Sequence, residues 1–304
     1  MRAVKRPFSV STKPTTPLSS ASSAPSWREI QKERIGIRAG DAQLDEVAVE
    51  EPLEVRVHGS ALAVLMRTPG REEDLIAGFL ASEGVVAGST DIAGVAPCAH
   101  LETGEPEPHI WNAVLAPGVQ FDPRERRFGA VSASCGLCGT RTLEDLERQL
   151  PDLSPPPASI REGFLVKAFD DLRAAQTLFR KTGGTHGAAL VDFDTSTLLE
   201  VAEDVGRHNA VDKVLGARLR SGDYPVQNPS ALLVSGRISY EIIQKAALAA
   251  VGSVAGIGAP TSLAVDAAKA AGLTLVGMVK GGTANRYAGS IDLTGADVLE
   301  IDRH

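Results

Sequence analysis

The sequence is poor in aromatic residues and has no long apolar run. Aromatic side chains make up 4% of the 304 residues, whereas apolar residues reach 43%. Small aliphatic residues must therefore fill the interior, a mix that suits α/β packing. No stretch approaches the roughly 18 unbroken apolar residues of a membrane helix, and no apolar segment follows the N-terminus as in a signal peptide. We expect a cytoplasmic protein without a membrane span.

Cysteine is also scarce, and the charge is unevenly distributed. Three cysteines, an odd number without an export signal, indicate a reducing compartment and no disulfide framework. The net charge is −7, yet residues 1–40 carry eight Lys or Arg, so the remainder has 23 basic against 36 acidic residues. The acidic charge of residues 41–304 argues against nucleic-acid binding, which needs a basic surface. An anionic ligand must therefore be bound by individual Lys or Arg side chains or by backbone N–H groups.

The first half of the chain divides into an extension and a small domain. Residues 1–33 begin with a stretch rich in Ser, Thr and Pro. Such a stretch buries too little apolar surface to offset the conformational entropy lost on ordering, so residues 1–33 are predicted to be disordered. Residues 34–134 are predicted to form an N-terminal α+β domain. Alternation over 53–57 predicts a strand, 61–66 a returning strand, and 68–84 a helix.

The second half has the rhythm of a helix-covered parallel sheet. We assign residues 135–150 to a thiol loop with a linker helix, and residues 151–304 to an α/β domain. Short apolar strands separated by helices of about 12 residues indicate parallel pairing. The expected elements are a helix over 165–179, strands at 188–191 and 198–201, a helix after Gly206, a strand at 232–234, a helix over 239–250, a strand at 253–257, a helix over 260–271 and a strand at 273–279.

The most specific chemical motif is Ser134-Cys135-Gly136-Leu137-Cys138-Gly139. Glycines on both sides keep the thiols free of steric bulk. A helix expected from Thr142 would place backbone N–H groups nearby, and these favour a thiolate over a thiol. Because the thiolate is the nucleophile in sulfur exchange, the segment fits nucleophilic sulfur chemistry.

A single CxxC motif leaves other interpretations open. Cys98, His100 and His109 could complete a four-ligand zinc site with the two thiols. A thioredoxin-like dithiol switch is a second possibility, although it is expected directly after a strand in a βαβ unit. The two cysteines could also be inert and buried. Cys98 by itself is typical of a small core residue.

Several polar clusters mark candidate ligand contacts. His186 lies in a glycine-rich turn, but Ala188 stands where a zinc deaminase needs its Glu, so deaminase chemistry is unsupported. Arg207 and His208 precede a helix and could contact a phosphate or pterin. Arg237 follows a predicted strand, at the position where open α/β sheets bind anions. Each cluster also has a plainer interpretation as a helix cap or surface charge.

Taken together, these stretches resemble one family, the formate dehydrogenase accessory sulfurtransferases (FdhD/NarQ). The similarity covers about residues 34–290 in order, and its combination of motifs is highly specific. The matching segments are Glu51-Pro52-Leu53, Thr68 to Gly84, Ser134 to Gly139, Thr182 to His186, Glu203 to Asn209, Ser235 to Glu241, and Pro260 to Ala264.

The resemblance implies a fold, a function and a set of site residues. It implies a cytidine deaminase-like C-terminal domain beside a smaller N-terminal α+β domain, in a homodimer. It implies a sulfurtransferase that moves sulfur from a cysteine desulfurase to the bis-molybdopterin guanine dinucleotide molybdenum cofactor, for formate dehydrogenase, without an intrinsic metal. Cys135 would carry the persulfide, with Cys138 as its partner. The cofactor-binding segment would be Met278, Val279, Lys280, Gly281, Gly282 and Thr283. A non-catalytic cofactor chaperone with a structural CxxC is the alternative function.

Overall fold

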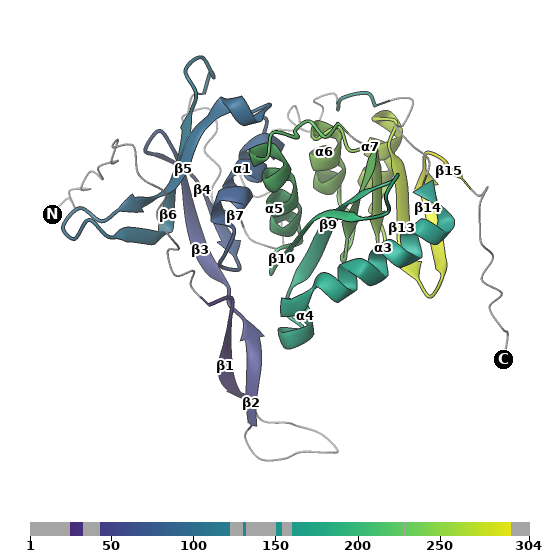
Figure 1. Ribbon diagram of the computed structural model, residues 1–304, viewed down its shortest axis with the longest axis horizontal. Helices are drawn as coiled ribbons and strands as arrows, with labels where there is room; N and C mark the ends of the chain where they lie inside the picture. The colour runs from purple at the N-terminus through teal and green to yellow at the C-terminus, as the bar shows by residue number, and fades with distance from the viewer. Residues whose placement is uncertain are drawn as a thin grey trace.

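The computed structural model describes residues 25–32, 43–121, 130–131, 150–153, 160–227 and 229–292. Two main β-sheets, each associated with helices, organise these residues (Figure 1). The elements are β1 (Trp27–Lys32), β2 (Gln43–Ala48), β3 (Glu51–Val57), β4 (Ser60–Arg67), α1 (Glu72–Ser82), η1 (Ser89–Asp91), β5 (Ile92–Ala99), β6 (Pro106–Leu115), β7 (Ala130–Val131), β8 (Ile160–Arg161), α3 (Glu162–Ala175), α4 (Thr177–Thr182), β9 (His186–Asp192), β10 (Leu198–Asp204), α5 (Arg207–Arg220), β11 (Ser230–Val234), α6 (Tyr240–Leu248), β12 (Ser253–Gly256), α7 (Ser262–Ala270), β13 (Thr274–Lys280), β14 (Thr283–Ala288) and β15 (Ile291–Asp292). No helix within this described part of the chain is long and apolar enough to cross a membrane.

The C-terminal sheet has six strands in the order β10-β9-β11-β12-β13-β14. The central strands β11, β12 and β13 are parallel, as the sequence pattern predicted, and the outer strands pair antiparallel. Alternating strand residues face opposite layers. Leu233 lies in the core shared with α3, whereas Leu232 lies in the core shared with α5, α6 and α7. The sheet is therefore covered on both faces, as buried parallel strands require.

The N-terminal sheet has five strands in the order β5-β6-β3-β4-β7. Strands β3 and β4 confirm the two strands and intervening turn predicted from residues 53–66. The helix begins later than predicted, at Glu72, because Arg71 adopts a left-handed φ of 63° at its N-cap. Arg71 keeps this conformation through bonds to the Asp74 carboxylate and the Val201 carbonyl.

The two sheets share one hydrophobic core, joined through α1 and α5. Leu75 and Leu80 of α1, with Val211 and Leu215 of α5, belong to a cluster that extends into both sheets. The helices cross at glycines. A Cβ on Gly78 would lie 1.9 Å from the Asp212 carbonyl oxygen, and one on Gly216 would lie 1.8 Å from the Asp74 carbonyl oxygen. Only glycine allows backbones to approach this closely.

The predicted extension over residues 1–33 is wrong for its last residues, because Trp27–Lys32 form strand β1. Its partner is β2, and their hairpin projects from the body (Figure 1). The Lys181 ammonium lies 3.0 Å from the centre of the Trp27 ring and 3.0 Å from the Glu46 carboxylate. This cation–π and ionic contact anchors the hairpin on α4. Composition alone did not reveal a strand that depends on a distant lysine.

The single helix predicted over 165–179 is two helices. α3 ends at Ala175 and α4 begins at Thr177. The residue between them, Gln176, is buried, and its side chain packs against Gly187, where a Cβ would lie 2.6 Å from it. The break turns this amide inward, toward the start of β9.

Candidate functional site at the carboxyl edge of the sheet

The predicted sulfur-carrying residues Cys135 and Cys138 lie outside the described residues, as does the helix expected from Thr142. The described residues on either side are well anchored. Before them, β7 pairs with β4 in the N-terminal sheet. After them, the Leu153 N–H donates to the Ala271 carbonyl at the end of α7, at 2.9 Å.

Three loops form a continuous edge where the parallel strands end. The Gly258 N–H donates to the Gly236 carbonyl at 3.2 Å, and the Met278 N–H donates to the Gly258 carbonyl at 3.1 Å. A Cβ on Gly258 would lie 2.6 Å from the Gly236 oxygen, so only glycine fits at this crossing. The loops after β11 and β12 and the end of β13 are thereby fixed against one another. Ligands of open α/β sheets bind at this edge.

A cluster of one histidine and two arginines lies on this edge, formed by His186, Arg207 and Arg237. The His186 ring and the Arg207 side chain flank Gly236, whose missing Cβ would lie 3.3 Å from His186 Nδ1 and 3.7 Å from Arg207 Cδ. Burial, together with the charges of Arg207 and Arg237, lowers the pKa of His186, while Asp204 opposes them. The structure therefore brings together three of the residues singled out from sequence.

The turn that carries His186 is fixed by Glu203. This carboxylate accepts hydrogen bonds from the Leu178 and Phe179 N–H groups, at 2.9 and 2.7 Å, and from the Thr185 hydroxyl at 3.0 Å. Glu203 thus caps the N-terminus of α4 and, through its bond to Thr185, also fixes the glycine-rich turn. The sequence does not reveal this role, because the groups that Glu203 binds lie about 20 residues away in the chain.

His208 joins the N-termini of α5 and α6. Its Nε2 lies 3.0 Å from the hydroxyl of Ser239, the N-cap residue of α6. Burial, then the positive charges of Arg207 and Lys245, lower the pKa of His208 to about 3. The imidazole is therefore neutral at physiological pH. Its Nδ1 is buried and has no hydrogen-bond partner among the described residues.

The segment Met278 to Thr283 forms a β-hairpin. Gly281 and Gly282 are the two-residue turn between β13 and β14, and the predicted contact of this segment with the cofactor stays a prediction. Their φ angles of 58° and 76° are the positive values that such a turn requires. Lys280 is exposed beside the turn, and Met278 is 47% exposed with a φ of 57°.

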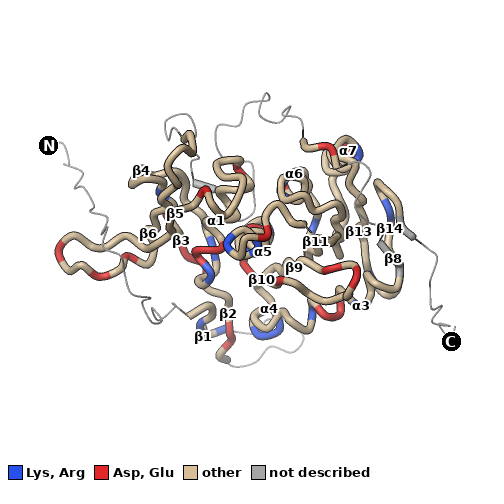
Figure 2. The backbone as a smooth tube through the Cα atoms, turned by 45° about the horizontal axis from the view of Figure 1, so that its top comes forward, with Lys and Arg blue, Asp and Glu red and all other residues tan. Residues whose placement is uncertain are grey.

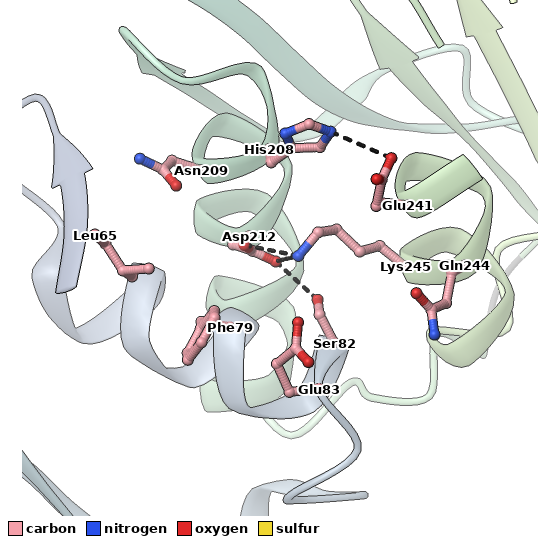
Figure 3. Close-up of a pocket in the computed structure, with 10 residues that line it drawn as sticks. All are labelled: Leu65, Phe79, Ser82, Glu83, His208, Asn209, Asp212, Glu241, Gln244 and Lys245. Carbon is pink, nitrogen blue, oxygen red and sulfur yellow. Dashed lines mark hydrogen bonds and ion pairs between the residues drawn. The ribbon is translucent and has the colours of Figure 1, made fainter. Parts of the chain in front are cut away.

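A second polar centre, missed by the sequence analysis, lies between α1, α5 and α6 (Figure 3). It surrounds a cavity of about 30 Å³. Lys245 Nζ lies 2.7 and 2.8 Å from the two carboxylate oxygens of Asp212, which also accepts the Ser82 hydroxyl at 2.7 Å. Burial raises the pKa of Asp212, opposed by Lys245. The contacts tie three helices together, and their direct role is structural.

Cys98, His100 and His109 do not form the ligand cluster considered for zinc. Cys98 is buried, and desolvation raises the pKa of its thiol. The two histidines lie on the β5–β6 hairpin near Glu107 and Glu51, each with a nitrogen 3.8 Å from a carboxylate oxygen. Within the described ranges, no group of three or more His, Cys, Asp or Glu is arranged to hold a metal ion.

Comparison with known proteins identifies the family. The sequence profile of the FdhD/NarQ family matches residues 48–293. The chain belongs to the FdhD/NarQ family. One relative, the sulfur carrier protein FdhD of Anaeromyxobacter dehalogenans, is 44% identical over 278 residues, covering 86% of this chain and 94% of the relative. The sulfur carrier protein FdhD of Streptomyces coelicolor is 43% identical over 261 residues, covering 84% and 92%.

A solved structure shares the fold of this FdhD/NarQ chain. It is a putative formate dehydrogenase accessory protein from Desulfotalea psychrophila, with a TM-score of 0.67 and 21% identity. The similarity covers 87% of this chain and 98% of that protein. A mixed α/β architecture is thus confirmed, while the likeness of the C-terminal half to cytidine deaminases stays a prediction.

Proposed function

We propose that this protein is a cytoplasmic sulfur carrier for formate dehydrogenase maturation, with Cys135 as the residue that holds the sulfur. Membership of a family whose relatives are named sulfur carrier proteins carries the proposal. The glycine-flanked CxxC supplies the chemistry, because a thiolate is the species that attacks a sulfur–sulfur bond. The sulfur donor would be a cysteine desulfurase, and the carrier would work as a homodimer.

Loading is a thiol–persulfide exchange in which atoms and electrons balance. The Cys135 thiolate attacks the outer sulfur of the donor's persulfide, a new sulfur–sulfur bond forms, and the donor leaves as a thiolate. For release, the Cys138 thiolate attacks the inner sulfur of the Cys135 persulfide. This forms a Cys135–Cys138 disulfide and frees one hydrosulfide, so the dithiol supplies the two electrons that reduce the transferred sulfur.

The proposed acceptor is the bis-molybdopterin guanine dinucleotide molybdenum cofactor, bound as cargo through the segment Met278 to Thr283. Lys280 supplies an exposed positive charge on an otherwise acidic protein. The edge carrying this hairpin also holds Arg207 and Arg237. These side chains provide local positive charge for the phosphates of the cofactor, although the chain as a whole is acidic. The bond between the Met278 N–H and the Gly258 carbonyl links the hairpin to that edge.

Intact mass after incubation with a cysteine desulfurase and cysteine tests sulfur loading. We expect a gain of one sulfur atom per chain that a reductant removes. Cys135→Ala should abolish the gain, while Cys98→Ala should retain it, because Cys98 is buried away from donors. A Cys135→Ala protein that still takes up sulfur would overturn the assignment. A wild type that binds guanine nucleotides but never loads sulfur would favour a non-catalytic cofactor chaperone.

A further inference from the structure

The end of β4 is held to the corner between β10 and α5 by a buried polar network. The Thr68 N–H donates to the Asp204 carboxylate at 3.1 Å, and the Val205 N–H donates to the Thr68 hydroxyl at 3.1 Å. The Asn209 side-chain amide donates to the Met66 carbonyl at 2.7 Å. These contacts join residues at least 136 positions apart, so they tie the N-terminal sheet to the first turn of α5.

A buried charge pair forms the centre of this network. The side chains of Asp204 and Lys213 are 0% and 1% exposed, and the ammonium lies 2.8 Å from the carboxylate. Asp204 also accepts the Gly206 N–H at 2.8 Å, and Lys213 donates to the Thr68 carbonyl at 3.0 Å. The pair therefore holds backbone groups on both sides of the boundary between the two halves.

Joining the two halves does not depend on this pair. The apolar core and the close crossing of α1 and α5 already connect them. A buried ion pair adds little stability compared with apolar side chains of similar volume, because the desolvation of both charges offsets their attraction. A fully hydrogen-bonded buried network does restrict the backbone to one arrangement. The pair therefore contributes a defined geometry more than stability.

The network lies where the thiol-bearing segment leaves the N-terminal sheet. β7 pairs with β4 in parallel, with Val131 opposite Leu65, so both strands run toward the end of the sheet that carries Thr68. Cys135 follows Val131 by four residues, which span at most about 14 Å. On the other side of the network, α5 begins at the carboxyl edge of the C-terminal sheet.

We infer that Thr68, Asp204 and Asn209 are positioning residues that place the thiol-bearing segment relative to the carboxyl edge for the delivery of sulfur. The inference rests on the proposed function for the sulfur on Cys135. Loading needs only an accessible thiol, because the donor approaches from outside. Delivery needs the acceptor close by, since a hydrosulfide released elsewhere diffuses into the solvent. The network should therefore affect delivery and leave loading unchanged.

Paired measurements of sulfur loading and formate dehydrogenase maturation test the inference on the full chain. Thr68→Val removes the hydroxyl and nearly keeps the volume. We expect unchanged loading by a desulfurase, measured by intact mass. Formate dehydrogenase activity should fall by about ten- to hundredfold in cells whose only copy of the protein is this variant, as expected for a small misplacement. Asn209→Ala removes the other contact across the boundary and should act in the same way, whereas Thr68→Ser keeps the hydroxyl and should retain activity.

Thr274→Val is the matched control. Thr274 is 0% exposed and Thr68 2%, and the Thr274 hydroxyl also makes a hydrogen bond to backbone, at the Ser290 carbonyl. Thr274 begins β13, at the amino edge of the parallel strands. Its substitution should lower stability as that of Thr68 does and leave maturation unchanged. Melting temperatures of all variants separate a loss of folded protein from a loss of delivery.

The outcomes separate this inference from the proposed function. A Thr68→Val protein that loads sulfur and supports normal maturation overturns the inference and leaves the proposed function standing. Equal losses of loading and maturation also overturn it, as do equal losses of maturation in Thr68→Val and Thr274→Val, because the network would then be purely structural. Failure of Thr68→Ser to support maturation has the same meaning. A wild type that never takes up sulfur removes the proposed function and the inference with it.

Discussion

His208 shows how a single side chain depends on its surroundings. Its ring contacts Ser239 and is held neutral by burial and neighbouring positive charge. In the sequence it stands inside a polar run that is equally typical of a surface helix cap. Its burial arises from the packing of α6 against α5, which no local pattern contains.

Protonation of His208 should couple stability to pH. Its pKa of about 3 in the folded chain lies below the ordinary value of 6.5, so the unfolded chain binds the extra proton between these values. Stability contributed by this site is therefore lost as the pH falls from 6.5 toward 3. We expect the unfolding free-energy difference between wild type and His208→Gln to shrink over that range in urea titrations. The exposed His109→Gln is the control, and a pH-independent difference would contradict the prediction.

Lys280 should contribute to nucleotide binding without affecting sulfur loading. It is exposed beside the β13–β14 turn, so its loss removes a charge without disturbing packing. We expect Lys280→Ala to weaken GDP binding by about 1–3 kcal/mol, the range for a charged hydrogen bond. Calorimetry measures the GDP affinity, and incubation with a desulfurase measures whether Cys135 is still loaded with sulfur. Unchanged GDP affinity would remove Lys280 from the binding site.

Sequence periodicity predicted the regular elements better than their ends and contacts. The βαβαβ unit from β11 to β13 followed from alternating apolar strands and helices, because a buried parallel sheet needs both. The hairpin turn at Gly281-Gly282 was not predicted, since a two-residue turn and a phosphate-binding loop both require glycine, and its role in cofactor binding stays a prediction. The buried pair Asp204 and Lys213, 0% and 1% exposed, resembles surface charge in sequence, because the partners that solvate it come from other elements.

The crossing of α1 and α5 should tolerate no side chain at its glycines. Gly78→Ala and Gly216→Ala would each place a Cβ within 2 Å of a carbonyl oxygen of the opposite helix. We expect each to lower the free energy of unfolding by about 3 kcal/mol or more, measured by urea denaturation. Gly163→Ala in α3 is the control, since a Cβ there meets nothing within 4 Å. Equal stabilities for all three variants would contradict this packing.

The molecule as a whole has two main sheets joined by one core cluster, and a second cluster lies under α3 on the other face of the C-terminal sheet. Residues 34–134 and 151–304 were predicted as separate domains because their patterns differ. Charged side chains also pair across the boundary, for example Arg220 with Asp74 at 2.6 Å. Figure 2 marks the basic and acidic positions on the backbone around α1 and α5. Periodicity within each half carries no information on whether the halves share an interior.

The shared core should make unfolding a single cooperative transition. Trp111 lies on β6 of the N-terminal sheet, whereas most described helices belong to the C-terminal half. Tryptophan fluorescence of a Trp27→Phe variant and far-ultraviolet circular dichroism should therefore give the same midpoint in urea. Two separated midpoints would show that the halves unfold independently.

The β1–β2 hairpin has a practical consequence for shortened forms of the protein. A truncation beginning at Arg34, where composition alone would place the cut, keeps β2 and deletes the strand that pairs with it. The freed backbone groups of β2 would then form an open edge, with Leu44 already 64% exposed. Such edges recruit strands from other molecules and promote aggregation. A cut before Pro25 retains both strands and the Trp27 anchor on α4, so it is the better start for an expression fragment.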